Sequence, residues 1–233
     1  MTKRLSAADG FRASLPIVLG YFPIAFSFGV AATRVGLSPA EATALSLIVF
    51  AGAAQFLSIA LIAANVPALV IAATMAAMNL RHLLYGPVLM RRAGADASRK
   101  RAWIWSFVLT DEVFGAALGA LARGGRFGEG FVAALGFTAY AAWVSGTLAG
   151  AWAGAGALDR WPAIAGGLGF MLAALFLSLL MSMMSRRHLP VIAVAGLATA
   201  AGVWFGSTTL GLFAGMVAGA LVGALPPGGR DAA

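Results

Sequence analysis

Two short polar strings interrupt long apolar stretches of this chain: NLRH at residues 79–82 and TDE at residues 110–112. Together they place an amide, a guanidinium, an imidazole and two carboxylates among aliphatic residues. If these stretches cross a bilayer, such groups are costly there, and they normally have both a partner of opposite charge and a task. The chemistry they suggest is recognition of a small polar or charged molecule inside the membrane.

The basic loop between the two strings sets their depth. Arg81 lies ten residues before Arg91, and Asp111 lies ten residues after Arg101. At 1.5 Å per helical residue, each group is about 15 Å inside the loop, which is near the middle of a hydrocarbon layer about 30 Å thick. A hairpin of two helices therefore predicts that Arg81 and Asp111 meet.

A site with both signs of charge suits a zwitterion. Arg81 is expected to bind a carboxylate and Asp111 or Glu112 an ammonium group. Asn79, Tyr85 and Gln55 are expected to add polar contacts. The plainer alternative is a structural ion pair that holds two helices together and binds nothing.

A proton could accompany such a molecule. His82 is a candidate carrier because its charge changes near physiological pH, and Glu112 and Asp111 are the carboxylate candidates. For His82 the alternative is an imidazole that only hydrogen-bonds to the backbone.

The elements that position these groups follow from composition. The chain has 233 residues, of which 61% are hydrophobic and 10% charged, so no water-soluble core would hide its apolar surface. We predict an all-α, polytopic transmembrane bundle of seven or eight segments, with one or more broken or re-entrant helices. The net charge of +8 is spread over short connectors, which favours lipid headgroups over nucleic acid as the partner.

The expected organisation is an N-terminal cytoplasmic arm, one transmembrane transport domain and a disordered tail, over residues 1–12, 13–225 and 226–233 respectively. Ser38 is the expected N-cap of the second segment, with Pro39 and Glu41 following it. The apolar segments are expected at residues 13–33, 39–64, 66–90, 102–122, 131–152, 163–184, 189–206 and 209–225.

Interrupted helices are expected at Pro23 and Gly29 in the first segment and at Gly52 in the second, because these residues break helices or leave backbone groups unpaired. With eight full crossings, the basic residues divide almost equally between the two sides. If one of the first three segments enters and returns, the first being the best candidate, the basic loop joins the N-terminus on the cytoplasmic side, as the positive-inside rule favours.

Four glycines, Gly211, Gly215, Gly219 and Gly223, recur every fourth residue in the last segment. Such a ladder lets two helix backbones approach closely. It predicts either packing within the chain or an interface for another subunit.

Motifs for enzymatic chemistry are missing from the sequence. There is no GxxxxGK[ST] loop, no HExxH and no GxSxG, and cysteine is absent. We therefore expect neither an enzyme nor a resident metal or cofactor, and transport would have to draw on an ion gradient.

The strings GYFPIAFSFG, FAGAAQF, NLRH with LYG, and TDE together resemble the AzlC family, the large subunit of two-component branched-chain amino acid exporters. The likeness is clearest over residues 11–115. It implies export of Leu, Ile, Val and probably Met across the bacterial inner membrane. It also implies a small AzlD-type membrane partner. The family's characteristic residues match Gln55, Asn79, Arg81, His82, Tyr85 and Asp111 of this chain. The roles given to these residues rest only on their expected depth in the membrane.

Overall fold

The computed structural model describes residues 4–157 and 188–224, with isolated positions between them. Most of the segment expected at 163–184 and the tail expected at 226–233 lie outside the described residues. The chain divides into two compact units, Met1–Leu172 and Ala173–Ala233. Within the described residues it is an all-helical membrane bundle, as predicted.

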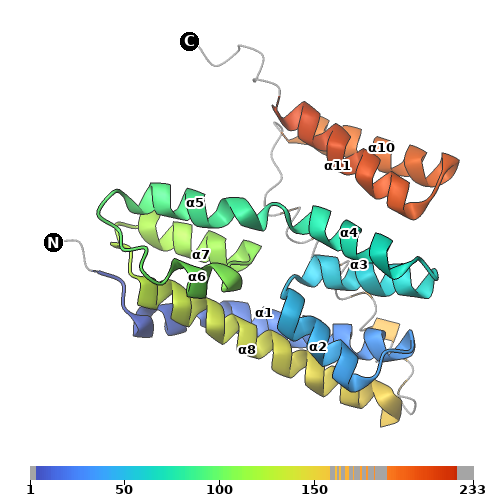
Figure 1. Cartoon of the computed structure of the whole chain (residues 1–233), viewed down its shortest axis with the longest axis horizontal. Helices are drawn as coiled ribbons and strands as arrows, with labels where there is room; N and C mark the ends of the chain where they lie inside the picture. The colour runs from blue at the N-terminus through green and yellow to red at the C-terminus, as the bar shows by residue number, and fades with distance from the viewer. Residues whose placement is uncertain are drawn as a thin grey trace. The chain divides into compact units, whose positions relative to one another are not determined.

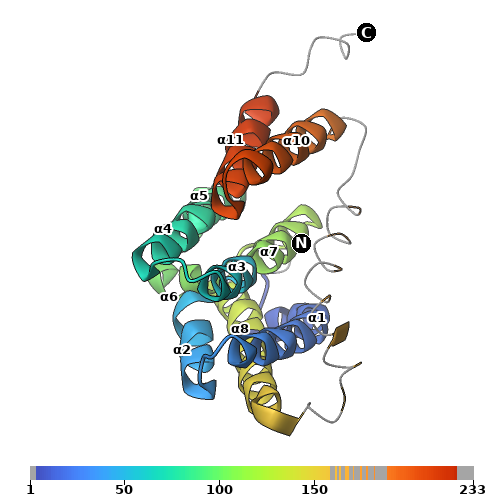
Figure 2. The ribbon, with the colours of Figure 1, turned by 90° about the vertical axis from the view of Figure 1, so that its right-hand side faces the viewer.

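Three long apolar helical stretches of the first unit are able to span a bilayer: α1 (Ala7–Arg34), the stretch Ala68–Ala93, and α8 (Glu129–Trp152). α1 begins before residue 13 because Ser6 and Asp9 form a capping box at its start. The expected arm is therefore partly helical. Seen along the spans, α8 lies between α1 and α2 (Pro39–Val49) (Figure 2).

The described helices of this unit are interrupted at three places. α2 stops at Val49, and α3 (Gly52–Ala63) starts after Phe50, which has a left-handed backbone with φ of 37°. α4 (Ala68–Asn79) and α5 (His82–Ala93) are separated by Leu80 and Arg81. The third interruption follows α6 (Ala102–Trp105) and the 3-10 turn η1 (Ser106–Val108), and α7 (Asp111–Ala122) leaves it at a bend of 118°.

The bent pair formed by α6–η1 and α7 is re-entrant. The loop that leads into α6 lines a pocket through Ser98, Lys100 and Arg101, together with Arg4 just before α1. The far end of α7 returns to the same place, because the Leu5 N–H donates to the Arg126 carbonyl at 3.0 Å. Both ends of the pair therefore lie at the end of the unit where α1 starts, and Asp111 lies at the turn between them.

α2 and α3 form a second re-entrant pair that enters from the opposite side. α2 follows the far end of α1, and α3 leads into α4, whose span returns to the basic end. Figure 1 shows α2 and α3 pointing from their break toward one end of the unit, and α6 and α7 toward the other. The prediction of one or more broken or re-entrant helices is confirmed by the bent pair, but the first segment, the favoured candidate, is one continuous helix.

α1 is continuous, which contradicts the breaks expected at Pro23 and Gly29. Pro23 removes one backbone hydrogen bond but lies inside a helix packed along α8. Gly29 serves close packing: a Cβ there would collide with the α8 backbone at Thr147. Gly150 is the reciprocal position, where a Cβ would collide with the Phe26 carbonyl. The break expected at Gly52 is confirmed.

The two broken pairs put the described basic connectors together at one end of the first unit. The basic end of the unit carries most of the described cations, whereas Arg34 lies at the other end. By the positive-inside rule we infer that the basic end faces the cytoplasm. Its cations are Arg4, Arg12, Arg91, Arg92, Arg99, Lys100, Arg101, Arg123 and Arg126.

The first unit also repeats one topology in opposite orientations. α1 is followed by the pair α2 and α3, and the α4–α5 span is followed by the pair α6–η1 and α7. α3 and α7 each have 12 residues and each start at the inner end of a re-entrant pair. The arrangement is that of an inverted repeat, a span plus a re-entrant hairpin entering from each side.

The second unit contains α10 (Leu189–Phe205) and α11 (Thr208–Ala224), packed against each other. Gly211 faces Val203 and Gly215 faces Thr199, with no room for a Cβ. Gly211, Gly215 and Gly219 of the ladder therefore lie in the contact between two helices of this chain, whereas Gly223 is exposed. These three glycines support the expected packing within the chain, and an interface for another subunit stays a prediction.

Candidate functional site

The charged groups of the two polar strings meet. An Arg81 Nη lies 2.8 Å from Asp111 Oδ2, and both side chains are 45% exposed in the isolated chain. Arg81 belongs to the interruption between α4 and α5, and Asp111 is the first residue of α7. The predicted pairing at equal depth is confirmed, although the path from the basic loop to Asp111 is bent rather than a straight helix.

Tyr85 completes the surroundings of Asp111. Its hydroxyl donates a hydrogen bond to Asp111 Oδ1, so this carboxylate is bonded to both Arg81 and Tyr85. The Tyr85 ring stacks on Phe114 at 4.5 Å between centroids, and the His82 ring packs edge-on against it at 5.2 Å. The tyrosine one turn beyond Arg81 is thus held in position by two aromatic rings.

Glu112, next in sequence, has a different partner. The Tyr21 hydroxyl, from the middle of α1, donates to Glu112 Oε2 and lies 2.6 Å from Thr110 Oγ1. Thr110 is also the N-cap of α7, where its hydroxyl accepts from the Val113 N–H. Sequence reasoning missed Tyr21, although it is one of only three tyrosines and lies within GYFPIAFSFG.

A cavity of about 370 Å³ lies where the three interruptions converge. Its size is within the ~300–1,000 Å³ range of small-molecule sites. Asn79 and His82 contribute polar groups to its wall. The remaining wall is mostly apolar and comprises Val49, Phe50, Leu83, Gly86, Pro87, Ser106, Phe107 and Leu109.

Gln55 belongs to a separate, buried network. It is 0% exposed, its amide nitrogen donates to Ser46 Oγ at 2.8 Å, and its carbonyl oxygen accepts from Trp143 Nε1 at 3.0 Å. Ser46 in turn lies 2.7 Å from Thr147 Oγ1. The network joins α2 and α3 to α8, and the structure does not bring Gln55 into contact with Arg81 or Asp111.

Tyr21 links the buried network around Gln55 to the carboxylate of Glu112. Its ring contacts the Trp143 ring at a centroid distance of 5.2 Å and the Phe50 ring at 6.2 Å, while its hydroxyl reaches Glu112. Phe50 is the left-handed residue at the break before Gly52. The interruption of one re-entrant pair is therefore in contact, through a single side chain, with the carboxylate at the interruption of the other.

The sequence of this chain matches a known protein family. A family model described as "AzlC protein" matches residues 16–156, which include every interrupted helix described above. The chain belongs to the AzlC family. The expected family likeness is thereby confirmed over more of the chain than the motifs covered.

Relatives of this AzlC family member are membrane proteins. "Inner membrane protein YgaZ" of Escherichia coli is 41% identical over 91% of this chain and 87% of its own length. An "Uncharacterized membrane protein" of Archaeoglobus fulgidus is 33% identical over 95% of this chain and 96% of its own. No solved structure matches significantly. With its long apolar helices, the chain is a multi-pass protein of the inner membrane.

Proposed function

We propose that this chain is a secondary transporter subunit that exports branched-chain amino acids across the inner membrane, together with a small AzlD-type partner. The observation that carries the proposal is the Arg81–Asp111 pair, held at an interruption of two helices. Neither residue lines the cavity itself, but their chain neighbours Asn79, His82 and Leu109 do. Interrupted helices near the bilayer midplane are where secondary transporters bind substrate. The inverted repeat is the topology from which many of them build alternating access.

The cavity's chemistry supports a small aliphatic amino acid as the substrate. The guanidinium of Arg81 would bind the carboxylate and Asp111 the ammonium group, with Asn79 adding a polar contact. Leu83 and Phe50, among other apolar lining residues, would surround a branched side chain. Leu, Ile and Val fit this description, and Met is a further candidate.

Proton coupling we assign to Glu112 ahead of Asp111 and His82. Asp111 already faces the Arg81 cation, whereas the bonded partner of Glu112 is the neutral hydroxyl of Tyr21. Proton uptake at Glu112 therefore does not require an ion pair to separate. Glu112→Gln is expected to retain leucine exchange between vesicle interior and exterior while losing the response to an imposed pH gradient.

A structural subunit is the second candidate function. The direct 2.8 Å contact favours it, because an ion pair that is already closed also serves to hold α7 against α5. On this view the path for the solute lies in the partner, and the pair contributes to assembly alone.

The test is efflux of accumulated labelled leucine and valine from cells that contain the chain and its partner. Arg81→Ala and Asp111→Asn are each expected to abolish efflux while the protein still reaches the membrane. Arg91→Ala and Asp96→Asn, the same changes in the basic loop, are matched controls and should transport normally. Normal efflux from both site variants contradicts the proposed site.

A further inference from the structure

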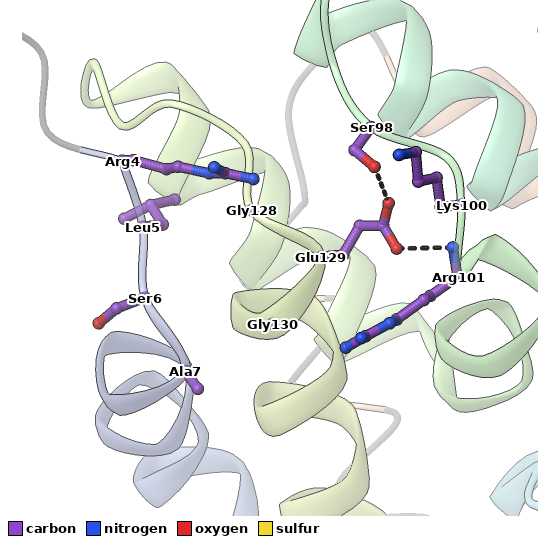
Figure 3. Close-up of a pocket in the computed structure, with 10 residues that line it drawn as sticks. All are labelled: Arg4, Leu5, Ser6, Ala7, Ser98, Lys100, Arg101, Gly128, Glu129 and Gly130. Carbon is purple, nitrogen blue, oxygen red and sulfur yellow. Dashed lines mark hydrogen bonds between the residues drawn. The ribbon is translucent and has the colours of Figure 1, made fainter.

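A pocket of about 470 Å³ lies at the basic end of the first unit, away from the interrupted helices (Figure 3). Three chain segments line it: the start of α1, the loop before α6 and the start of α8. Arg4, Lys100 and Arg101 bring its cations from two of these segments. In Figure 3 the side chains of Arg4 and Arg101 approach the start of α8 from opposite sides.

The carboxylate in this pocket is already engaged. Glu129 accepts hydrogen bonds from Ser98 Oγ and, at 2.7 Å, from the Arg101 N–H. It therefore fastens the loop to the start of α8. Among the described residues, no ion pair joins Arg4, Lys100 or Arg101 to a carboxylate within 4.0 Å. The three cations thus outnumber the single acid that lines the pocket.

Backbone contacts of the neighbouring Leu5 hold Arg4 in position. Its neighbour Leu5 donates to the Arg126 carbonyl at 3.0 Å, and the Leu5 carbonyl lies where a Cβ on Gly128 would be. Arg4 also lines an adjoining pocket of about 440 Å³, together with Arg92, Arg126 and Asp96. The two hollows share Arg4 and form one strongly basic region.

The surroundings match the membrane interface. Trp103, two residues after Arg101, is 78% exposed, as is common for tryptophans at headgroup level. The start of α8 has no side-chain cap, so its first N–H groups add partial positive charge at the pocket. Basic pockets between helices on the cytoplasmic side are suited to acidic lipid headgroups.

We propose that the pocket lined by Arg4, Lys100 and Arg101 binds a phosphate ester, supplied by the headgroup of an anionic phospholipid. Guanidinium groups form bidentate, charge-assisted bonds to phosphate, and the two arginines approach from separate segments. A bound headgroup would connect the N-terminal segment, the basic loop and α8. A free phosphate ester shares this chemistry, so the test must separate the two sources.

The experiment is native mass spectrometry of the full chain in neutral detergent, titrated with phosphatidylglycerol or with phosphatidylcholine of the same acyl chains. The double variant Arg4→Gln/Arg101→Gln is compared with Arg12→Gln/Arg99→Gln. The second pair removes the same charge from the same end but does not line either hollow. Circular dichroism verifies that both variants are folded.

The wild-type chain is expected to retain phosphatidylglycerol in preference to phosphatidylcholine. The pocket pair should lower that affinity at least about tenfold, and the control pair by less than about twofold, because only the former removes charge-assisted bonds. If the pocket pair does not fold, Arg101→Gln alone must show the loss. Equal retention of both lipids, or equal losses in both pairs, overturns the proposal.

Competition with a soluble phosphate ester identifies the source of the bound phosphate. Glycerol 3-phosphate added at millimolar concentration should leave phosphatidylglycerol bound if the acyl chains contribute, which supports a lipid site. Displacement with measurable binding of glycerol 3-phosphate alone supports a site for soluble phosphate esters. Both results depend on the pocket residues and not on leucine transport.

Discussion

The two re-entrant pairs have the same topology, but the polar residues near their breaks differ in charge and in burial. At the break between α2 and α3, Gln55 and Ser46 are neutral, fully buried and hydrogen-bonded to α8. At the start of α7, Asp111 is 45% exposed and forms an ion pair with Arg81. We infer that the first pair is a fixed support and the second is the working half of the site.

Gln55→Leu is expected to have the largest effect on stability. It leaves the buried Trp143 N–H without a partner, at about 1–3 kcal/mol for an unsatisfied group, and the Ser46 hydroxyl keeps only its hydrogen bond with Thr147. Thermal unfolding in detergent should show a clearly lowered midpoint. Because this half is a support, efflux per folded molecule should stay near wild type; selective loss of efflux with unchanged stability would reverse the comparison.

Tyr21→Phe tests the connection between the halves. The ring contacts to Trp143 and Phe50 remain, but the hydrogen bond to Glu112 is lost. A hydrogen bond to a charged group contributes about 1.5–3 kcal/mol, so we expect efflux to fall about tenfold or more. Initial efflux rates, normalised to the amount of protein in the membrane, provide the measurement. Unchanged rates would mean that Glu112 does not depend on α1.

Thr110→Ala should have the smallest effect of the three. It removes the N-cap of α7, which is worth about 1 kcal/mol, and one hydroxyl beside Tyr21. We expect a modest fall in the unfolding midpoint, with efflux reduced only a fewfold. Thr110→Ser, which keeps the hydroxyl, should behave as wild type. A loss as large as that of Asp111→Asn would show that Thr110 itself belongs to the site.

The sequence predicted the Arg81–Asp111 pair because the two arms of a hairpin from one basic loop are equally long, and charges in lipid need partners. It also predicted the break at Gly52. These inferences use local spacing and the cost of burying charge. Both quantities can be read from a single sequence.

Other features depend on contacts between distant segments. Pro23 reads as a break, yet α1 continues because it packs along α8 over its length. Gln55 reads as a polar group facing a path, yet Trp143 and Ser46 satisfy it internally. The interruption at Leu80 and Arg81 has no glycine or proline to announce it, and nothing local indicates that Tyr21 reaches Glu112.

The central claim is that the guanidinium and the carboxylate at the middle of the membrane bind a zwitterion in one orientation. Exchanging them, Arg81→Asp with Asp111→Arg, tests it most directly through leucine efflux and protein abundance in the same cells. We predict that the exchanged pair is as abundant as the wild-type protein while efflux stays absent, because the charges then face the wrong ends of the substrate. Recovery of wild-type efflux would contradict the claim and identify the pair as structural.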